Sequence, residues 1–137
     1  MSTPDRSQPP LILIVDDEPD VVFMLESRLL SWGYRVRSAS DGRAAISSAL
    51  EERPDLVVMD LQMPVLDGRL ACRHFKSDPR LCGIPIILVT ASAEYIQKEQ
   101  MEEGMADAYV IKPFDAADLK GQIQRSLTAG PQPPREK

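Results

Sequence analysis

Five short apolar runs, rich in valine, isoleucine and leucine, recur along the chain with polar and mixed segments between them. Continuous apolar runs of this length are typical of strands that are buried on both faces, as in a parallel sheet. The predicted strands are residues 11–15, 34–36, 56–59, 84–89 and 108–111.

The segments between these runs have helical spacing. Val22, Leu25, Leu29 and Trp32 advance by three, four and three residues, which places them on one face of a helix. We expect further helices over residues 44–50, 70–75, 96–101 and 119–127, with Pro19 opening the first and Asp41-Gly42 preceding the second. Regular alternation of strand and helix predicts one α/β sandwich, with a parallel sheet covered by helices on both faces.

Proline is concentrated at the two ends of the chain. Three of the 12 prolines lie in the first ten residues and three in the last eight. These polar ends can bury little surface, so we expect tails at residues 1–10 and 130–137. The remaining residues, 11–129, form one predicted domain, and 137 residues suit one domain.

The charge balance and the scarcity of histidine and cysteine exclude several classes of protein. Lys and Arg total 16 against 21 Asp and Glu, a net charge of −5, which argues against nucleic-acid binding by this chain. One His and two Cys cannot form a His-rich metal site or a four-thiolate zinc site. No apolar run reaches the length that a signal peptide or a membrane helix requires, so we expect a cytoplasmic protein without membrane contact. In that compartment we expect Cys72 and Cys82 to be free thiols.

Chemically active side chains follow four of the five predicted strands. Asp16-Asp17-Glu18 ends the first, Asp60 the third, Thr90 the fourth and Lys112 the fifth. Sites in open α/β sheets form beyond the carboxyl ends of the strands, so these residues are expected to converge. Clustered carboxylates repel one another unless a cation shares the site, and Mg²⁺ prefers such oxygen ligands. With an ammonium and a hydroxyl nearby, the pattern favours phosphoryl chemistry.

Four motifs stand out in the chain: residues 12–18 (ILIVDDE), 55–64 (DLVVMDLQMP) with 67–68 (DG), 85–91 (PIILVTA) and 109–114 (YVIKPF). In their order and spacing they resemble the receiver domain of response regulators, the phosphoacceptors of two-component signalling, including the chemotaxis regulators. The resemblance covers residues 11–127 and implies a flavodoxin-like (βα)5 sandwich with strand order 2-1-3-4-5.

The resemblance implies specific roles for the acidic residues. Asp60 would accept the phosphoryl group. Asp17 and Asp60 would bind Mg²⁺ directly, together with the main-chain carbonyl of Gln62, and Asp16 would reach the ion through water. An aspartyl phosphate needs a carboxylate nucleophile and strong neutralisation of charge on phosphorus, which this set supplies.

It also implies roles on the fourth and fifth strands. Lys112 would pair with the phosphoryl oxygens, and its peptide bond to Pro113 would be cis. Thr90 and Tyr109 would form the switch pair. The sequence departs from the family pattern at none of these positions, so an active receiver is expected.

As a receiver, the chain would take its phosphoryl group from a histidine kinase or a histidine phosphotransfer protein. It would signal to a downstream protein target as a monomer or weak dimer, and would catalyse only its own phosphorylation and dephosphorylation. Whether it acts alone or as part of a larger protein stays open, because the proline-rich end resembles a linker. His74 is expected on a helix surface and not as a phosphodonor.

Two other classes compete with the receiver interpretation. A Mg²⁺-dependent phosphohydrolase of the haloacid-dehalogenase type also uses a strand-end aspartate, but Gln62 stands where its second aspartate would be. A flavodoxin-like flavin binder would need a phosphate loop rich in Ser, Thr and Gly after the first strand. The acidic residues 16–18 occupy that place.

Overall fold

The centre of the fold is a parallel sheet of five strands in the order β2-β1-β3-β4-β5. The computed structural model describes residues 8–61, 68–91 and 106–129. The strands are β1 (Leu11–Val15), β2 (Arg35–Ala39), β3 (Leu56–Asp60), β4 (Ile86–Thr90) and β5 (Ala108–Ile111). The strand order and the α/β sandwich expected from the sequence are confirmed.

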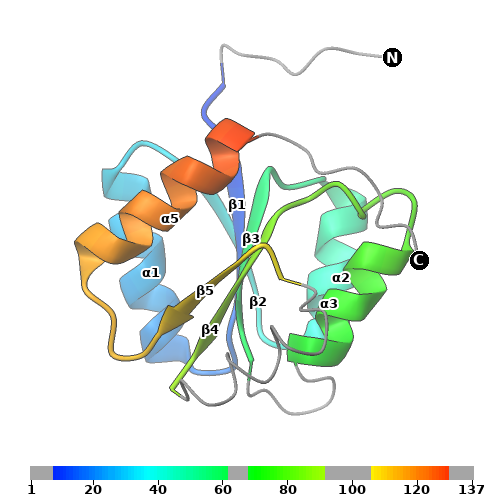
Figure 1. Cartoon of the computed structure of the whole chain (residues 1–137), viewed down its shortest axis with the longest axis horizontal. Helices are drawn as coiled ribbons and strands as arrows, with labels where there is room; N and C mark the ends of the chain where they lie inside the picture. The colour runs from blue at the N-terminus through cyan, green and yellow to red at the C-terminus, as the bar shows by residue number, and fades with distance from the viewer. Residues whose placement is uncertain (1–7, 62–67, 92–105, 130–137) are drawn as a thin grey trace.

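Four helices in the described part of the chain cover both faces of this sheet. They are α1 (Pro19–Ser31), α2 (Gly42–Glu51), α3 (Gly68–Ser77) and α5 (Ala116–Ala129). Helices α1 and α5 lie on one face and α2 and α3 on the other (Figure 1). The helix expected over residues 96–101 lies outside the described residues. None of the described helices is long and apolar enough to cross a membrane.

Side-chain alternation along the strands divides the core into two clusters. In β1, Leu13 and Val15 face α2 and α3, whereas Ile12 and Ile14 face α1 and α5. The three central strands β1, β3 and β4 are buried along their whole length, which explains why they are apolar at nearly every position. The core therefore lies in two layers, one on each side of the sheet.

Two strand predictions need correction. The second strand begins at Arg35, not at residue 34, because the Tyr34 N–H still donates to the carbonyl of Leu29 at the end of α1. It then continues through Arg37 and Ser38 to Ala39, because an edge strand that is only partly buried can hold polar residues. The fourth strand begins at Ile86, because Ile84 donates to the carbonyl of Leu81 in the preceding turn.

The starts of two helices follow from residues that the sequence displays. Pro19 occupies the first turn of α1, and the side chain of Asp41 accepts a hydrogen bond of 2.8 Å from the Ala44 N–H at the start of α2.

The residues before β1 contact the start of β2. The carbonyls of Pro9 and Pro10 accept hydrogen bonds from Arg35. These two prolines, which were expected to lie in a tail, are thus hydrogen-bonded to the first residue of β2.

Helix α1 ends in a Schellman motif centred on Gly33, which has a φ of 93°. Its N–H donates to the Leu30 carbonyl and the next N–H, of Tyr34, donates to that of Leu29. We expect Gly33→Ala to lower the free energy of unfolding by about 1 kcal/mol, because an L side chain is strained in the left-handed region. Urea denaturation measures this change.

Gly121→Ala is the matched control for this prediction. Gly121 lies inside α5, and the atoms nearest to an added Cβ would belong to the flexible Arg125 side chain, at an ordinary contact distance of 3.5 Å. Alanine is favoured over glycine inside a helix by about 1 kcal/mol, so this variant should gain stability. Equal effects of the two substitutions would contradict the role assigned to the φ of Gly33.

Candidate functional site

The carboxyl ends of β1 and β3 place two aspartates side by side with one lysine. Lys112 follows β5, and its Nζ lies 3.1 Å from Asp60 Oδ2 and 3.8 Å from Asp16 Oδ2. Both aspartates are buried, whereas the lysine remains partly accessible. The structure thus brings together three residues that the sequence places far apart.

Asp16 is held by bonds to its own loop and to a neighbouring strand. Its Oδ1 accepts the N–H of Glu18 at 2.9 Å, and its own N–H donates to the Ala39 carbonyl at 3.1 Å. Burial raises the pKa of the Asp16 carboxyl, the Glu18 N–H opposes this, and the negative charge of Asp60 raises it further. A cation at this position would favour the ionised form.

The pKa of Lys112 is raised by its acidic surroundings. Burial lowers it, but the hydrogen bond to Asp60 and the charges of Asp60, Asp16 and Glu18 outweigh burial. The ammonium therefore stays charged at neutral pH and partly neutralises the two buried carboxylates. Its peptide bond to Pro113 is cis.

Asp16 also belongs to a group of three acids that follows β1, together with Asp17 and Glu18. Asp16, Asp17 and Glu18 each offer a carboxylate oxygen within 4.8 Å of the others, and Asp17 and Glu18 are exposed. Hard oxygen donors at this spacing fit Mg²⁺, which binds through one or two carboxylates and retains several waters. The sequence prediction did not assign Glu18 to the metal site, although it stands in the same acidic run.

Thr90 and Tyr109 lie on the adjacent strands β4 and β5. Thr90 is buried at the end of β4, and its carbonyl accepts the Lys112 N–H at 2.7 Å. Tyr109, on β5, is half-buried against the core beneath α2 and α3. Gln62, whose carbonyl was expected to bind the metal, lies outside the described residues.

Gly68 contacts the main chain of Asp60 from the start of α3. A Cβ at this position would lie 2.4 Å from the Asp60 carbonyl oxygen and 2.8 Å from the Leu61 Cα, so no side chain fits. Its N–H donates to the Leu61 carbonyl at 2.9 Å. The sequence prediction noted this glycine only as part of a motif. Gly68 packs directly against the main chain of Asp60, the aspartate at the centre of the site. This contact depends on tertiary packing, which the spacing of motifs in the sequence does not reveal.

A sequence model of the family described as "Response regulator receiver domain" matches residues 12–124. The chain belongs to this family of two-component signalling domains. Its relatives include the "Probable transcriptional regulator ycf27" of Guillardia theta, 40% identical over 116 residues that make up 85% of this chain and 44% of that protein. The chain thus spans less than half the length of this curated relative.

Solved structures of receiver domains agree with the fold. The receiver domain of sensor histidine kinase PA1611 from Pseudomonas aeruginosa PAO1 superimposes with a TM-score of 0.79 at 36% identity, covering 88% of this chain and 98% of that chain. That receiver domain has a magnesium ion coordinated in its active-site cleft. Response regulator TrrA from Thermotoga maritima, in complex with Mg²⁺-BeF, gives 0.77 at 30% identity, covering 85% and 98%.

The acidic group provides a direct test of Mg²⁺ binding. We expect Asp17→Asn to weaken Mg²⁺ affinity by at least about tenfold, since even changes behind a metal ligand cost roughly 10–100-fold. Isothermal titration of the parent and the variant with MgCl₂ measures this loss. Asp20→Asn, an acid in the first turn of α1, is the control and should bind Mg²⁺ like the parent. Unchanged affinity of the Asp17 variant would exclude this carboxylate from the metal site.

Proposed function

We propose that this receiver domain accepts a phosphoryl group on Asp60 from the phosphohistidine of a kinase or phosphotransfer protein. The observation that carries the proposal is the contact of 3.1 Å between the buried Asp60 carboxylate and the charged Lys112 ammonium, beside a group of acids suited to Mg²⁺. The magnesium-bound receiver domain of PA1611 supports the same use of the acids in this chain.

Each residue has a defined part in the proposed reaction. Asp60 Oδ attacks phosphorus, a P–O bond to the carboxylate forms, and the bond from phosphorus to the donor nitrogen breaks and leaves its electron pair on the histidine. Lys112 pairs with a phosphoryl oxygen that gains negative charge. Asp16, Asp17, Asp60 and the Gln62 carbonyl would hold Mg²⁺, which supplies further neutralisation of that charge when bound.

The alternative of a phosphohydrolase of the haloacid-dehalogenase type has less support. That chemistry uses an acid two positions after the nucleophile, and this chain has Gln62 there. A receiver would act catalytically only on its own aspartate. A cytoplasmic location and a protein target downstream are part of the same proposal.

The proposed function is tested by mass spectrometry after incubation with acetyl phosphate and Mg²⁺. One phosphoryl group should be added, and chelation of the metal should prevent the addition. Borohydride reduces an acyl phosphate to an alcohol, so peptide mapping after reduction should find homoserine at position 60. Homoserine at another position, or no mass change, would overturn the assignment.

The proposal includes a switch from Thr90 to Tyr109. A phosphoryl group on Asp60 adds about −1.5 to −2 charges and three acceptor oxygens, to which the Thr90 hydroxyl can donate. Movement of Thr90 toward those oxygens would open space for the Tyr109 ring, one strand further along the sheet. Phosphorylation can shift the population from one arrangement of Thr90 and Tyr109 to the other only as far as the difference in contacts between the two arrangements allows.

We expect Thr90→Ala to accept the phosphoryl group on Asp60 but to lose most of the conformational response. The response is measured by NMR as the beryllofluoride-induced chemical-shift change at the Tyr109 and Val110 amides. Thr128→Ala, which removes a hydroxyl bonded to the Gln124 carbonyl on α5, should respond like the parent. A full response in the Thr90 variant would show that its hydroxyl is not part of the switch.

A further inference from the structure

A shielded ion pair joins α3 to the start of β5, at the end of the sheet opposite the acids. Lys76 Nζ lies 2.8 Å from Asp107 Oδ2, and the two side chains are only 7% and 16% exposed. The ammonium also donates to the Ile84 carbonyl at 3.2 Å. Lys76 belongs to the last turn of α3, and Asp107 immediately precedes β5.

Asp107 also forms hydrogen bonds with both the main-chain N–H and the main-chain carbonyl of Ile86, the first residue of β4. The same Oδ2 accepts the Ile86 N–H at 2.7 Å, and the Asp107 N–H donates to the Ile86 carbonyl at 2.9 Å. Asp107 therefore connects three elements. Its Oδ2 binds Lys76 of α3 and Ile86 of β4, and its main chain leads directly into β5.

Strand β5 is poorly specified by its own sequence. It has four residues, all apolar, and it pairs with β4 at the edge of the sheet. A slip of one residue exchanges the two faces of a strand, and because β5 is apolar on both faces, its hydrophobic pattern discriminates little between the two registers. In the observed register Tyr109 packs toward α2 and α3, whereas Ala108 and Val110 pack toward α1 and α5.

We propose that the Lys76–Asp107 ion pair fixes the register of β5 on β4 and thereby positions Lys112 against Asp60. Burial of an ion pair costs desolvation, so its best-attested use is to select one arrangement and not to add stability. In this register Ile111 lies opposite Thr90, and the next residue, Lys112, donates its N–H to the Thr90 carbonyl.

The functional part of this inference rests on the proposed role of Lys112 in phosphoryl transfer. Lys76 and Asp107 are positioning residues, because they act on the site through β5 and touch neither Asp60 nor the acidic group. The acids for Mg²⁺ lie on the β1 and β3 side of the site. Loss of the ion pair should therefore affect Lys112 and spare metal binding.

The test uses Lys76→Met, which keeps an unbranched apolar side chain and removes the charge. We expect phosphorylation of Asp60 by acetyl phosphate to slow by roughly tenfold, because small displacements of a charge-stabilising group cost about this much or more. The Mg²⁺ dissociation constant should change by less than about twofold. Lys76→Arg restores a cation, and we expect it to recover most of the rate.

Amide hydrogen exchange gives a second measurement that does not depend on phosphorylation. In Lys76→Met, exchange should accelerate by at least about tenfold at the Lys112 N–H, which belongs to the β4–β5 pairing. It should change little at the Asp55 N–H, which is bonded to the Leu11 carbonyl at 2.8 Å beside β1. Equal acceleration at both amides would indicate general destabilisation and would overturn the proposal.

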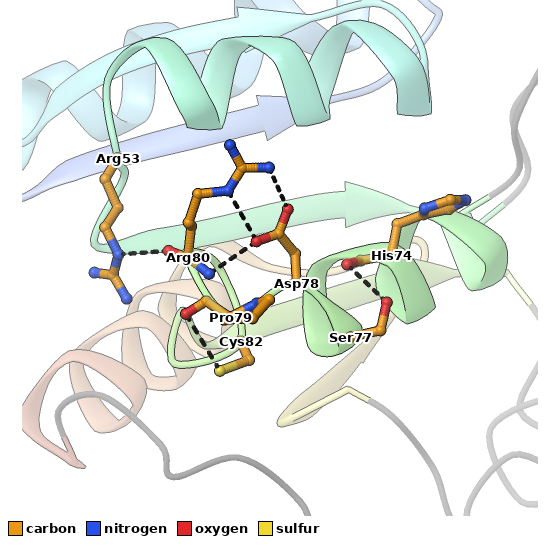
Figure 2. Close-up of polar contacts among 7 residues, drawn as sticks. All are labelled: Arg53, His74, Ser77, Asp78, Pro79, Arg80 and Cys82. Atoms are coloured by element: carbon orange, nitrogen blue, oxygen red, sulfur yellow. Dashed lines mark hydrogen bonds and ion pairs between the residues drawn. The ribbon is translucent and has the colours of Figure 1, made fainter.

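The control breaks an ion pair of equal length that is not shielded. Arg80 Nη2 lies 2.8 Å from Asp78 Oδ2 in the loop after α3, where the Arg80 side chain is 69% exposed (Figure 2). The side-chain contacts of Arg80 with Asp78 are local, since Asp78 also accepts the Arg80 N–H and Nε. The bond from Arg53 Nε goes to the Arg80 main-chain carbonyl, which a change of the Arg80 side chain leaves in place. Arg80→Met should behave like the parent in both measurements.

The outcomes separate the two proposals. A parent protein that takes up no phosphoryl group would overturn the proposed function, and the exchange at Lys112 would still decide whether the ion pair fixes β5. Normal phosphorylation and normal exchange in Lys76→Met would overturn the register proposal alone. A Lys76→Arg variant as impaired as Lys76→Met would also overturn it.

Discussion

Asp60→Asn is expected to abolish phosphorylation, with a rate at least about 100-fold below that of the parent under identical acetyl phosphate and Mg²⁺ concentrations. Asparagine has nearly the same size and shape, so the fold should be retained. Its amide, however, is not a nucleophile toward phosphorus and binds Mg²⁺ more weakly than a carboxylate. Intact-protein mass spectrometry over a time course measures the loss.

The control for this variant is Asp118→Asn on the exposed surface of α5, which should be phosphorylated like the parent. Thermal unfolding of both variants shows whether the fold is intact. Removal of one buried carboxylate also reduces repulsion with Asp16, so Asp60→Asn should unfold at the parent temperature or above it. Phosphorylation of a folded Asp60→Asn protein at the parent rate would show that another residue is the acceptor.

Phe75→Ala is expected to lower the free energy of unfolding by about 3–5 kcal/mol. Phe75 is 0% exposed, and its ring fills the core layer between α3 and the sheet, together with residues of α2. Truncation to alanine leaves a cavity that the surrounding strands and helices can close only in part. Because natural domains are stable by about 5–15 kcal/mol, this one substitution removes a large fraction of the total.

Leu70→Ala provides the comparison on the same helix. Leu70 is 45% exposed on the outer side of α3, so its truncation should change stability by about 0.5 kcal/mol or less. Urea denaturation at constant pH measures both variants. Similar losses for the two would mean that α3 does not pack on the sheet through Phe75.

Features set by local chemistry were predictable from the sequence. Of the three strands that are buried on both faces, β1 and β3 were found within one residue of their bounds, because such strands are apolar at nearly every position. Edge strand β2 was predicted too short, because its polar residues are at most partly buried and carry no apolar signal. The start of β4 was placed two residues early, since Ile84 is buried like a strand residue but lies in a turn.

The candidate site was predictable where a rule of topology brings distant residues together. Asp16, Asp60 and Lys112 converge because the carboxyl ends of parallel strands share one edge of the sheet. The contact of Gly68 with the Asp60 main chain and the pairing of Lys76 with Asp107 were not predicted. Both depend on how α3 sits against the sheet, which neither periodicity nor motif spacing determines.

The separation of Asp60 and Lys112 by 52 positions in the chain has a consequence for how signalling competence is gained and lost. In an unfolded chain every aspartate is an ordinary, solvated carboxylate without a nearby ammonium, so none of them is a selective acceptor. Cooperative folding of a small domain creates the whole site in one step. The amount of signal that such a protein can carry should therefore follow its folded fraction, and substitutions far from the acids should silence it by depopulating the native state.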